Sequence, residues 1–159
     1  MTEITVTAPR QRPIPSQRQD FLHFEEITTR WNDNDVYGHM NNAVHYGLFD
    51  SVVNRWLHDV GKQDPRSSDL IGLVVHSSCD YHAELAYPDK ITAGLRIDSL
   101  GRTSVTYRVA LFAENRETSA AEGIFVHVYV DRAARKPASI ADGLRAAMTR
   151  LQRSEVTTP

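Results

Sequence analysis

Between about Asn42 and Val60 the chain predicts a helix that is apolar around most of its surface, and few folds can accommodate such a helix. Its apolar residues fall on two lines at helical spacing, Val44, Leu48, Val52 and Trp56, and Phe49, Val53, Leu57 and Val60. Asn41 or Asn42 is suited to cap the beginning of this helix and Gly61 to end it. So wide an apolar stripe is typical of a helix enclosed by the rest of the protein. Gly47, in its middle, predicts a close backbone contact.

Most of the remaining chain as far as Arg132 shows the patterns of β-strands. The predicted strands are His23–Trp31, Ile71–His82, Lys90–Leu100, Val105–Leu111 and Ile124–Val130, and a short amphipathic helix, Ile140–Leu151, follows them. Tight turns such as Gly101-Arg102 indicate antiparallel neighbours, because parallel pairs need long crossovers. The last strand is apolar on both faces, as a central strand is. We therefore predict an α+β fold in which an antiparallel sheet wraps around one long central helix.

The length of the chain, 159 residues, is typical of one domain. Residues 1–20 contain Pro9, Pro13 and Pro15 among Arg and Gln and almost no large apolar residues, so we expect a flexible tail there. The domain is predicted to cover residues 21–153, with a C-terminal tail at residues 154–159.

Charge and hydropathy argue against several classes of partner. Lys and Arg number 18 against 20 Asp and Glu, a net charge of −2, whereas nucleic-acid-binding proteins usually carry a basic excess. No apolar run approaches the ~18 residues that cross a bilayer, and the N-terminus lacks the apolar core of a signal peptide. We therefore expect a cytoplasmic protein that binds neither nucleic acid nor membranes. The single cysteine, Cys79, lies in an apolar strand pattern, which indicates a buried structural thiol.

Polar side chains are concentrated between the first strand and the long helix, in the segment RWNDNDVYGHMNN, residues 30–42. This segment begins like a calcium loop, but Val44 stands where the last ligand, a glutamate, is needed. His39 and His45 lack the i, i+4 spacing of paired ligands on a helix. We therefore predict no metal site. The chain also contains neither a G-x-S-x-G nucleophile motif nor a glycine-rich phosphate loop.

A more promising feature is the position of Asp35, a few residues before the start of the long helix. The unpaired amides of a helix's first turn, aided by the helix dipole, can stabilise an oxyanion. A carboxylate beside them can attack a carbonyl carbon or activate a water molecule against it. The residues alone leave a plainer alternative open, in which Asp33 and Asp35 only cap turns.

Three long segments of the chain match one known family in order. They are RWNDNDVYGHMNNAVHYGLFDSVVN, SSCDYHAELAYPDKITAGLRIDSLGRTSVTY and FVHVYVDRAARKP, and they lie between about Phe24 and Pro137. They resemble hotdog-fold thioesterases of the 4-hydroxybenzoyl-CoA thioesterase type, and the D-x-D-x-x-G-H-x-N-N pattern is specific within hotdog proteins. The resemblance implies the hotdog fold, no cofactor, and homodimers or homotetramers whose sheets join edge to edge, with active sites between subunits.

The resemblance also implies roles for individual residues. Asp35 corresponds to the catalytic carboxylate, which acts as general base or nucleophile, and the backbone amide of Asn42 corresponds to the group that polarises the thioester carbonyl. His39 either orients water or Asp35, or is a structural hydrogen-bonding residue. Tyr37, Gly38 and His45 are predicted to contact the substrate. The resemblance also implies that coenzyme A contacts three residues of the turn before the fourth strand, which are Arg102, Thr103 and Ser104.

The implied function is hydrolysis of an acyl-CoA thioester to a free acid and coenzyme A. Two residues depart from the family's pattern, since His45 stands where relatives usually have Tyr and Glu84 where they often have Pro. The acyl group is therefore left open. Two alternatives also stay open, a thioesterase that acts on acyl groups held by a carrier protein and a non-catalytic module that binds acyl-CoA.

Overall fold

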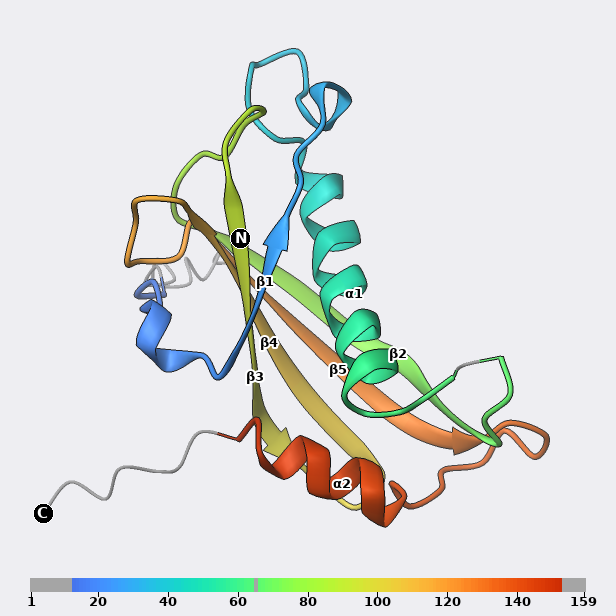
Figure 1. Cartoon of the computed structure of the whole chain (residues 1–159). Coiled ribbons are helices and arrows are strands. Elements are labelled where there is room, and N and C mark those ends of the chain that lie inside the picture. The colour runs from blue at the N-terminus through green and yellow to red at the C-terminus, as the bar shows by residue number, and fades with distance from the viewer. Residues whose placement is uncertain (1–12, 65, 153–159) are drawn as a thin grey trace, which may run out of the picture.

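The computed structural model describes residues 13–64 and 66–152 of the chain. Within these residues five antiparallel strands form one sheet in the order β1-β3-β4-β5-β2. The strands are β1 (His23–Ile27), β2 (Leu70–Tyr81), β3 (Ile91–Leu100), β4 (Ser104–Ala113) and β5 (Ala121–Asp131). Helix α1 (Asn42–Asp59) lies across one face of the curved sheet, and α2 (Asp142–Thr149) packs beside the end of β3 (Figure 1). The predicted α+β architecture, one antiparallel sheet around one long helix, is confirmed.

The core lies between α1 and the sheet. The buried apolar residues of α1 are Phe49, Val52, Val53 and Trp56. Helix and sheet approach most closely at Gly123 of β5, where an added Cβ would overlap the Phe49 ring. At Gly47 no atom lies within 4 Å of such a Cβ, so the close contact predicted there does not exist within one protomer.

The first strand is shorter than predicted. β1 ends at Ile27, and the residues expected to extend it lead into a short 3-10 helix, Trp31–Asp33. The Asp33 carboxylate accepts a hydrogen bond from the Arg30 N–H at 2.7 Å, which stabilises this turn. The remaining predicted strands and both predicted helices begin and end within three residues of their observed bounds.

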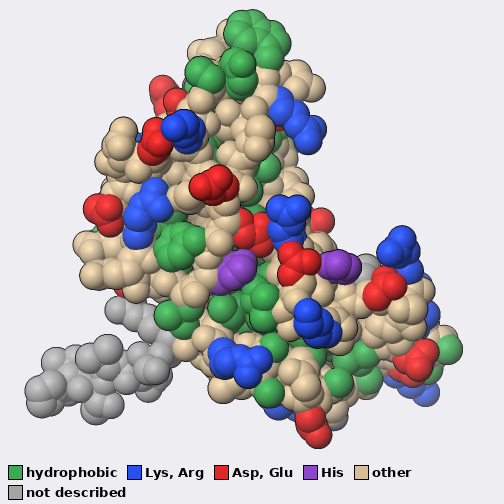
Figure 2. Space-filling view, viewed as in Figure 1, with side chains coloured by type: hydrophobic (Ala, Val, Ile, Leu, Met, Phe, Trp, Pro, Cys, Tyr) green, Lys and Arg blue, Asp and Glu red, His purple; other side chains and the backbone are tan. Residues whose placement is uncertain are grey.

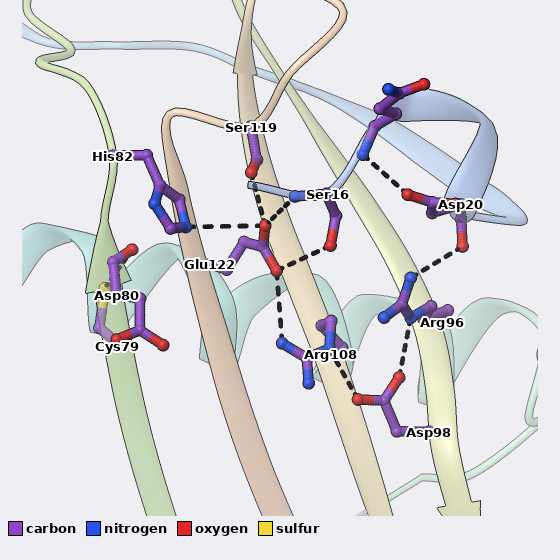
Figure 3. A network of polar contacts seen from close by, with 11 residues as sticks. Ser16, Asp20, Cys79, Asp80, His82, Arg96, Asp98, Arg108, Ser119 and Glu122 are labelled. Atoms are coloured by element: carbon purple, nitrogen blue, oxygen red, sulfur yellow. Dashed lines mark hydrogen bonds and ion pairs between the residues drawn. The ribbon is translucent and has the colours of Figure 1, made fainter. Parts of the chain in front are cut away.

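The segment 16–20 packs on the face of the sheet that is turned away from α1 (Figure 3). The Glu122 carboxylate accepts hydrogen bonds from the Ser16 N–H at 2.5 Å and from the Ser16 hydroxyl at 3.0 Å. Arg18 donates to Thr92 at 2.6 Å and stacks over the Phe112 ring. The expectation of a tail up to residue 20 therefore does not hold for residues 16–20. Residues 1–12 of the expected N-terminal tail and the whole expected C-terminal tail, residues 154–159, lie outside the described residues.

Glu122 is a buried carboxylate that holds this segment in place (Figure 3). The Ser119 hydroxyl also donates to it, at 2.6 Å, and Arg108 does so at 3.3 Å. Burial alone would raise the pKa of the Glu122 carboxyl, but the hydrogen bonds from Ser119 and Ser16 and the charge of Arg108 bring it below its ordinary value. The carboxylate is therefore ionised and fully bonded at neutral pH.

Strand β2 forms a long free edge of the sheet, while β5 lies between β4 and β2 as predicted for a strand with two apolar faces. β2 has 12 residues, against five in β1 at the opposite edge. Its exposed apolar residues are Leu73, Val74, Val75 and Tyr81, with exposed fractions of 39–59 %. Cys79 is half-buried rather than buried, and desolvation raises the pKa of its thiol to about 11, which keeps it protonated.

Candidate active site

The segment that precedes α1 folds into a tight, internally bonded loop. Asn34 and Met40 form an antiparallel bridge. The Asp35 N–H donates to the His39 carbonyl at 2.9 Å, and the Gly38 N–H donates to the Asp35 carbonyl at 3.2 Å. Gly38 has a φ of +89°, a conformation that favours glycine, so its observed role is to form this turn. The loop thereby holds Asp35 in a fixed orientation beside the helix.

The two carboxylate oxygens of Asp35 have different surroundings. Oδ1 accepts a hydrogen bond from the Tyr37 N–H at 2.8 Å. Oδ2 lies 3.7 Å from Nδ1 of His39, beyond hydrogen-bond distance, and accepts no hydrogen bond from any described residue. The side chain is 18 % exposed. Asp35 therefore caps a turn through one oxygen, as the plainer alternative requires, and keeps the other available for a substrate or water molecule.

The N-terminus of α1 presents a free amide next to this loop. The N-cap residue is Asn41, whose Oδ1 accepts from the Ala43 N–H at 2.9 Å. Asn42 follows as the first helical residue, and within the described chain its N–H has no hydrogen-bond partner. An unpaired N–H at the positive end of a helix dipole is suited to bind a developing oxyanion.

Asp35 and the start of α1 line one pocket of about 460 Å³. Its walls consist of Asp35, Tyr37, His39, Met40, Asn42, His45, Tyr81, His82, Ala83, Glu84 and Leu85. Five of the predicted site residues thus come together here, and Gly38 shapes the loop that carries them. Asp33 is not among them, because its carboxylate is bonded to the Arg30 amide.

His45 is a buried, neutral histidine in this pocket, with 4 % of its surface exposed. Desolvation lowers its pKa, although the hydrogen bond to the Asn41 carbonyl opposes this effect. Because a carbonyl only accepts, Nδ1 carries the proton in the 3.1 Å contact with Asn41, and Nε2 is left as an acceptor. The ring packs edge-on against Tyr81, with centroids 5.1 Å apart.

Two pocket residues were missed by sequence reasoning, His82 and Tyr81, which follow one another at the end of β2. Nε2 of His82 lies 3.7 Å from the Glu122 carboxylate and has no hydrogen-bond partner among the described residues. The Tyr81 hydroxyl lies 3.5 Å from the Asn42 carbonyl. Both residues reach the loop only through the pairing of β2 with β5, so no local sequence pattern reveals them.

The three residues predicted to contact coenzyme A are not near Asp35 in the same protomer. β5 pairs with Tyr81 at Ala121 and with Ser104 at Val128, seven residues further along. At about 3.3 Å per residue the two ends are roughly 23 Å apart. Arg102 instead donates to the Ser139 hydroxyl at 3.0 Å, close to α2. Within one protomer, the structure therefore separates Arg102, Thr103 and Ser104 from the Asp35 loop.

Other kinds of site were sought across residues 13–64 and 66–152. These residues contain no group of three or more His, Cys, Asp or Glu side chains placed to hold a metal ion. None of the helices in this part of the chain is long and apolar enough to cross a membrane. Acidic and basic side chains are interspersed over the face of the molecule in Figure 2, without a large area of one sign.

Comparisons with known proteins place the chain in a family. Residues 29–148 match the thioesterase-like superfamily. The crystal structure of the PA5185 protein from Pseudomonas aeruginosa PAO1 is 48 % identical, covers 89 % of this chain and 99 % of that chain, and superposes with a TM-score of 0.85. The YsmA protein of Bacillus subtilis is 22 % identical over 131 residues, which are 82 % of this chain and 87 % of that protein.

A thioesterase from Thermus thermophilus, crystallised with coenzyme A and zinc, shares the fold. It is 24 % identical, covers 84 % of this chain and 96 % of that chain, and has a TM-score of 0.70. The superfamily match extends over residues 29–148, about three quarters of the chain, and includes the Asp35 loop, α1 and all of β2–β5. This hotdog-fold chain belongs to the thioesterase-like superfamily.

Proposed function

We propose that the protein is an acyl-CoA thioesterase, which hydrolyses an acyl-coenzyme A thioester to a free acid and coenzyme A. The proposal rests on one observation. Asp35, with its free Oδ2, and the unpaired Asn42 N–H lie in the same pocket. Membership of the thioesterase-like superfamily supports thioester hydrolysis as the reaction. The T. thermophilus thioesterase, which was crystallised with coenzyme A, supports the choice of leaving group.

The geometry suits Asp35 as a general base. Oδ2 takes a proton from a water molecule while the water oxygen forms a bond to the thioester carbonyl carbon. The carbonyl electron pair moves onto oxygen, where the Asn42 N–H and the helix dipole stabilise the charge. When the carbonyl re-forms, the C–S bond breaks and its electron pair leaves with the coenzyme A sulfur. Base catalysis of this kind contributes about 10²–10⁴-fold and one oxyanion donor about 10²–10³-fold.

A nucleophilic role for Asp35 uses the same contacts. Oδ2 would then attack the carbonyl carbon directly and expel the thiolate, which leaves a mixed anhydride that water hydrolyses. In both routes His39 would orient Asp35 once its Nδ1, which lies 3.7 Å from Oδ2 in the structure, moves within hydrogen-bond distance. His45 contributes a neutral ring with a free acceptor at the place where the acyl group would lie.

We further propose that the protein is a cytoplasmic homodimer, or a homotetramer made of two such dimers, in which each dimer is joined through the free edges of β2. This edge is long and carries exposed apolar residues, a combination that monomeric proteins usually avoid. Joining two β2 strands would bring the far end of one protomer's sheet beside the Asp35 loop of the other. Arg102, Thr103 and Ser104 would then approach coenzyme A bound at the partner's site.

The proposal is tested by measuring free-thiol release from a panel of acyl-CoAs that includes aromatic, short-chain and long-chain acyl groups. We expect turnover on at least one member, and the preferred acyl group would define the pocket. Turnover only on acyl groups attached to a carrier protein would favour the carrier-protein alternative. Saturable acyl-CoA binding without turnover of any thioester would contradict the enzymatic proposal and favour a binding module.

A further inference from the structure

A second pocket, of about 320 Å³, opens between the C-terminal half of α1 and the beginning of β2. Residues of three elements line it, among them Asn54 and Leu57 of α1, Leu70 and Gly72 of β2, and His127 and Tyr129 of β5. It lies at the opposite end of β2 from the Asp35 pocket, and the hydrolysis described above uses none of these side chains. We call it the His127 pocket.

His127 is a buried histidine that no described residue satisfies. It is 3 % exposed, and neither of its ring nitrogens has a hydrogen-bond partner among the described residues. The ring packs edge-on against Tyr107, with centroids 5.1 Å apart. Buried polar groups nearly always have partners, so two unpaired nitrogens in a pocket wall indicate a ligand that supplies them.

The backbone leaves space in front of this ring. A Cβ at residue 72 would lie 3.1 Å from Nδ1 of His127 and 3.3 Å from the Tyr129 ring. Both ring nitrogens are buried in the pocket wall, and glycine at position 72 leaves Nδ1 without the close Cβ contact that any larger residue would impose. The pocket also contains Leu57 and Leu70, which suit a hydrocarbon group. The remaining wall includes polar and charged side chains, among them His58, Gln63, Asp64 and Arg66.

The chemistry of the ring identifies the polar group that fits. Desolvation lowers the pKa of His127, against a smaller opposing effect of the Asp50 carboxylate. The ring is therefore uncharged at neutral pH, with one N–H donor and one nitrogen acceptor. A hydroxyl group has the matching acceptor and donor, whereas a carboxylate can only accept and would leave the acceptor nitrogen of His127 without a partner.

In the proposed dimer, β2 would pair antiparallel with β2 of a second copy, and this pairing would determine which site lies next to the His127 pocket. In such a pair the beginning of one strand lies beside the end of the other. The beginning of β2, at Leu70 and Gly72, lines the His127 pocket, and its end, at Tyr81, lines the Asp35 pocket. Both pockets lie on the α1 side of the sheet. Each Asp35 pocket is therefore continued by the His127 pocket of the other protomer.

We propose that the His127 pocket receives the distal end of the acyl group whose thioester lies beside Asp35 of the other protomer, and that His127 selects acyl groups with a hydroxyl group at that end. The inference rests on the proposed thioesterase function and on the β2 dimer. It names the substrate class as distally hydroxylated acyl thioesters with an apolar chain.

The preference is tested first by binding, without chemistry. Hexanoyl-, octanoyl- and decanoyl-CoA and their ω-hydroxy counterparts are titrated calorimetrically into the Asp35→Asn variant. We expect the hydroxylated member of the best-fitting pair to bind at least about tenfold more tightly, because a site built to hydrogen-bond a hydroxyl rejects the analogue without it. Equal binding of both members at every chain length would overturn the inference, even if wild-type protein hydrolyses these thioesters.

Variants then assign the preference to His127. The binding ratio is the affinity for the ω-hydroxyacyl-CoA divided by that for its unsubstituted counterpart, measured in the Asp35→Asn background. His127→Leu removes both nitrogens and is expected to reduce this ratio to about one. His127→Gln keeps a donor and an acceptor and is expected to restore part of it. His23→Gln, a matched change on β1, is expected to leave the ratio unchanged. An unaltered ratio in His127→Leu would overturn the assignment. Absence of wild-type turnover would instead count against the proposed hydrolysis, since the binding ratio is independent of it.

Mixed dimers test whether the two pockets belong to different protomers. Asp35→Asn and His127→Leu chains with different affinity tags are co-expressed, and the mixed dimer is isolated. If the site is shared, one of its two sites has both Asp35 and His127, so turnover regains the wild-type preference at about half the wild-type rate. If both residues serve the same protomer's site, the only active site lacks His127 and shows no preference, which would overturn the inference.

Discussion

Asp35 and His45 illustrate how single hydrogen bonds assign chemical roles. One bond from the Tyr37 N–H orients the Asp35 carboxylate and leaves Oδ2 unbonded. One bond to the Asn41 carbonyl fixes the tautomer of His45 and leaves Nε2 as an acceptor. Both bonds come from backbone groups of the same short loop, so the conformation of the loop determines the chemistry of the pocket.

The buried ring of His45 predicts a loss of stability in mild acid. In the unfolded chain a histidine binds a proton near its ordinary pKa of 6.5, whereas burial lowers the pKa of His45 in the fold. Between pH 6.5 and the lower folded pKa the unfolded state binds more protons, so the free energy of unfolding falls as the pH falls. His45→Gln removes this contribution, and urea unfolding at pH 5.0–7.5 should show a shallower pH dependence. Equal slopes for the two proteins would contradict the prediction.

Glu122 predicts a second loss of stability at lower pH, since it is an anion that the fold keeps ionised. Its pKa lies below the ordinary 4.5 in the fold, so its stabilising contribution is complete above pH 4.5 and is lost as the pH falls through the folded value. Glu122→Gln should lower the free energy of unfolding by about 1–3 kcal/mol at pH 7.

The difference in the free energy of unfolding between wild type and Glu122→Gln, measured by chemical unfolding, should become smaller below pH 4. Cleavage before residue 16 by a protease should also become faster in the variant, because the hydrogen bonds to Ser16 are weakened. A stability difference that is constant from pH 7 to pH 3 would show that the charge of Glu122 does not contribute.

At the scale of elements, local periodicity predicts most of the fold. α1 and the strands β2–β5 follow from apolar spacing and tight turns, and Asp35 follows from the dense polar segment before α1. The contacts of segment 16–20 could not be predicted in this way, because Ser16 meets Glu122 across 106 residues of sequence. His127 was missed for a related reason. In the sequence it is one polar residue in an apolar strand, and only the register of β5 against β2 places it behind Gly72.

The packing of α1 on β5 predicts a contrast between two glycines. Gly123→Ala places a Cβ into the Phe49 ring, and overpacking of this kind destabilises a fold by about 1–3 kcal/mol. Gly47→Ala meets no atom within 4 Å and should gain up to about 1 kcal/mol of helix propensity. Urea unfolding of the two variants measures the contrast. Equal destabilisation by both substitutions would contradict the observed packing.

At the scale of the whole molecule, one protomer does not enclose α1 as fully as the sequence predicts. Tyr46 of the helix and its C-cap residue Val60 are 36 % and 41 % exposed, and β2 leaves apolar side chains at its free edge. The wide apolar stripe predicts a helix that is mostly enclosed, and the proposed second protomer at β2 would account for the part that the sheet leaves open. The same proposed partner would bring the predicted coenzyme A residues toward the Asp35 loop.

The proposed dimer predicts sensitivity to charge at the middle of β2. Val75 lies at the midpoint of the strand and is 59 % exposed, so two copies of Val75→Lys would place like charges close together in an antiparallel pair. We expect this variant to be monomeric by light scattering and to lose acyl-CoA turnover. Ile14→Lys adds the same charge at a residue outside β2 that is 91 % exposed, and it should remain dimeric. A dimeric, active Val75→Lys protein would place the interface elsewhere.

The most direct test of the proposed hydrolysis compares two neighbouring aspartates on the best acyl-CoA substrate. Asp35→Asn should lower kcat about 10²–10⁴-fold, because an amide cannot accept the proton from water, and should still bind acyl-CoA. Asp33→Asn keeps the acceptor that the Arg30 N–H needs and should retain most of the wild-type kcat. A near-normal kcat in Asp35→Asn would remove Asp35 from the reaction and contradict the proposed mechanism.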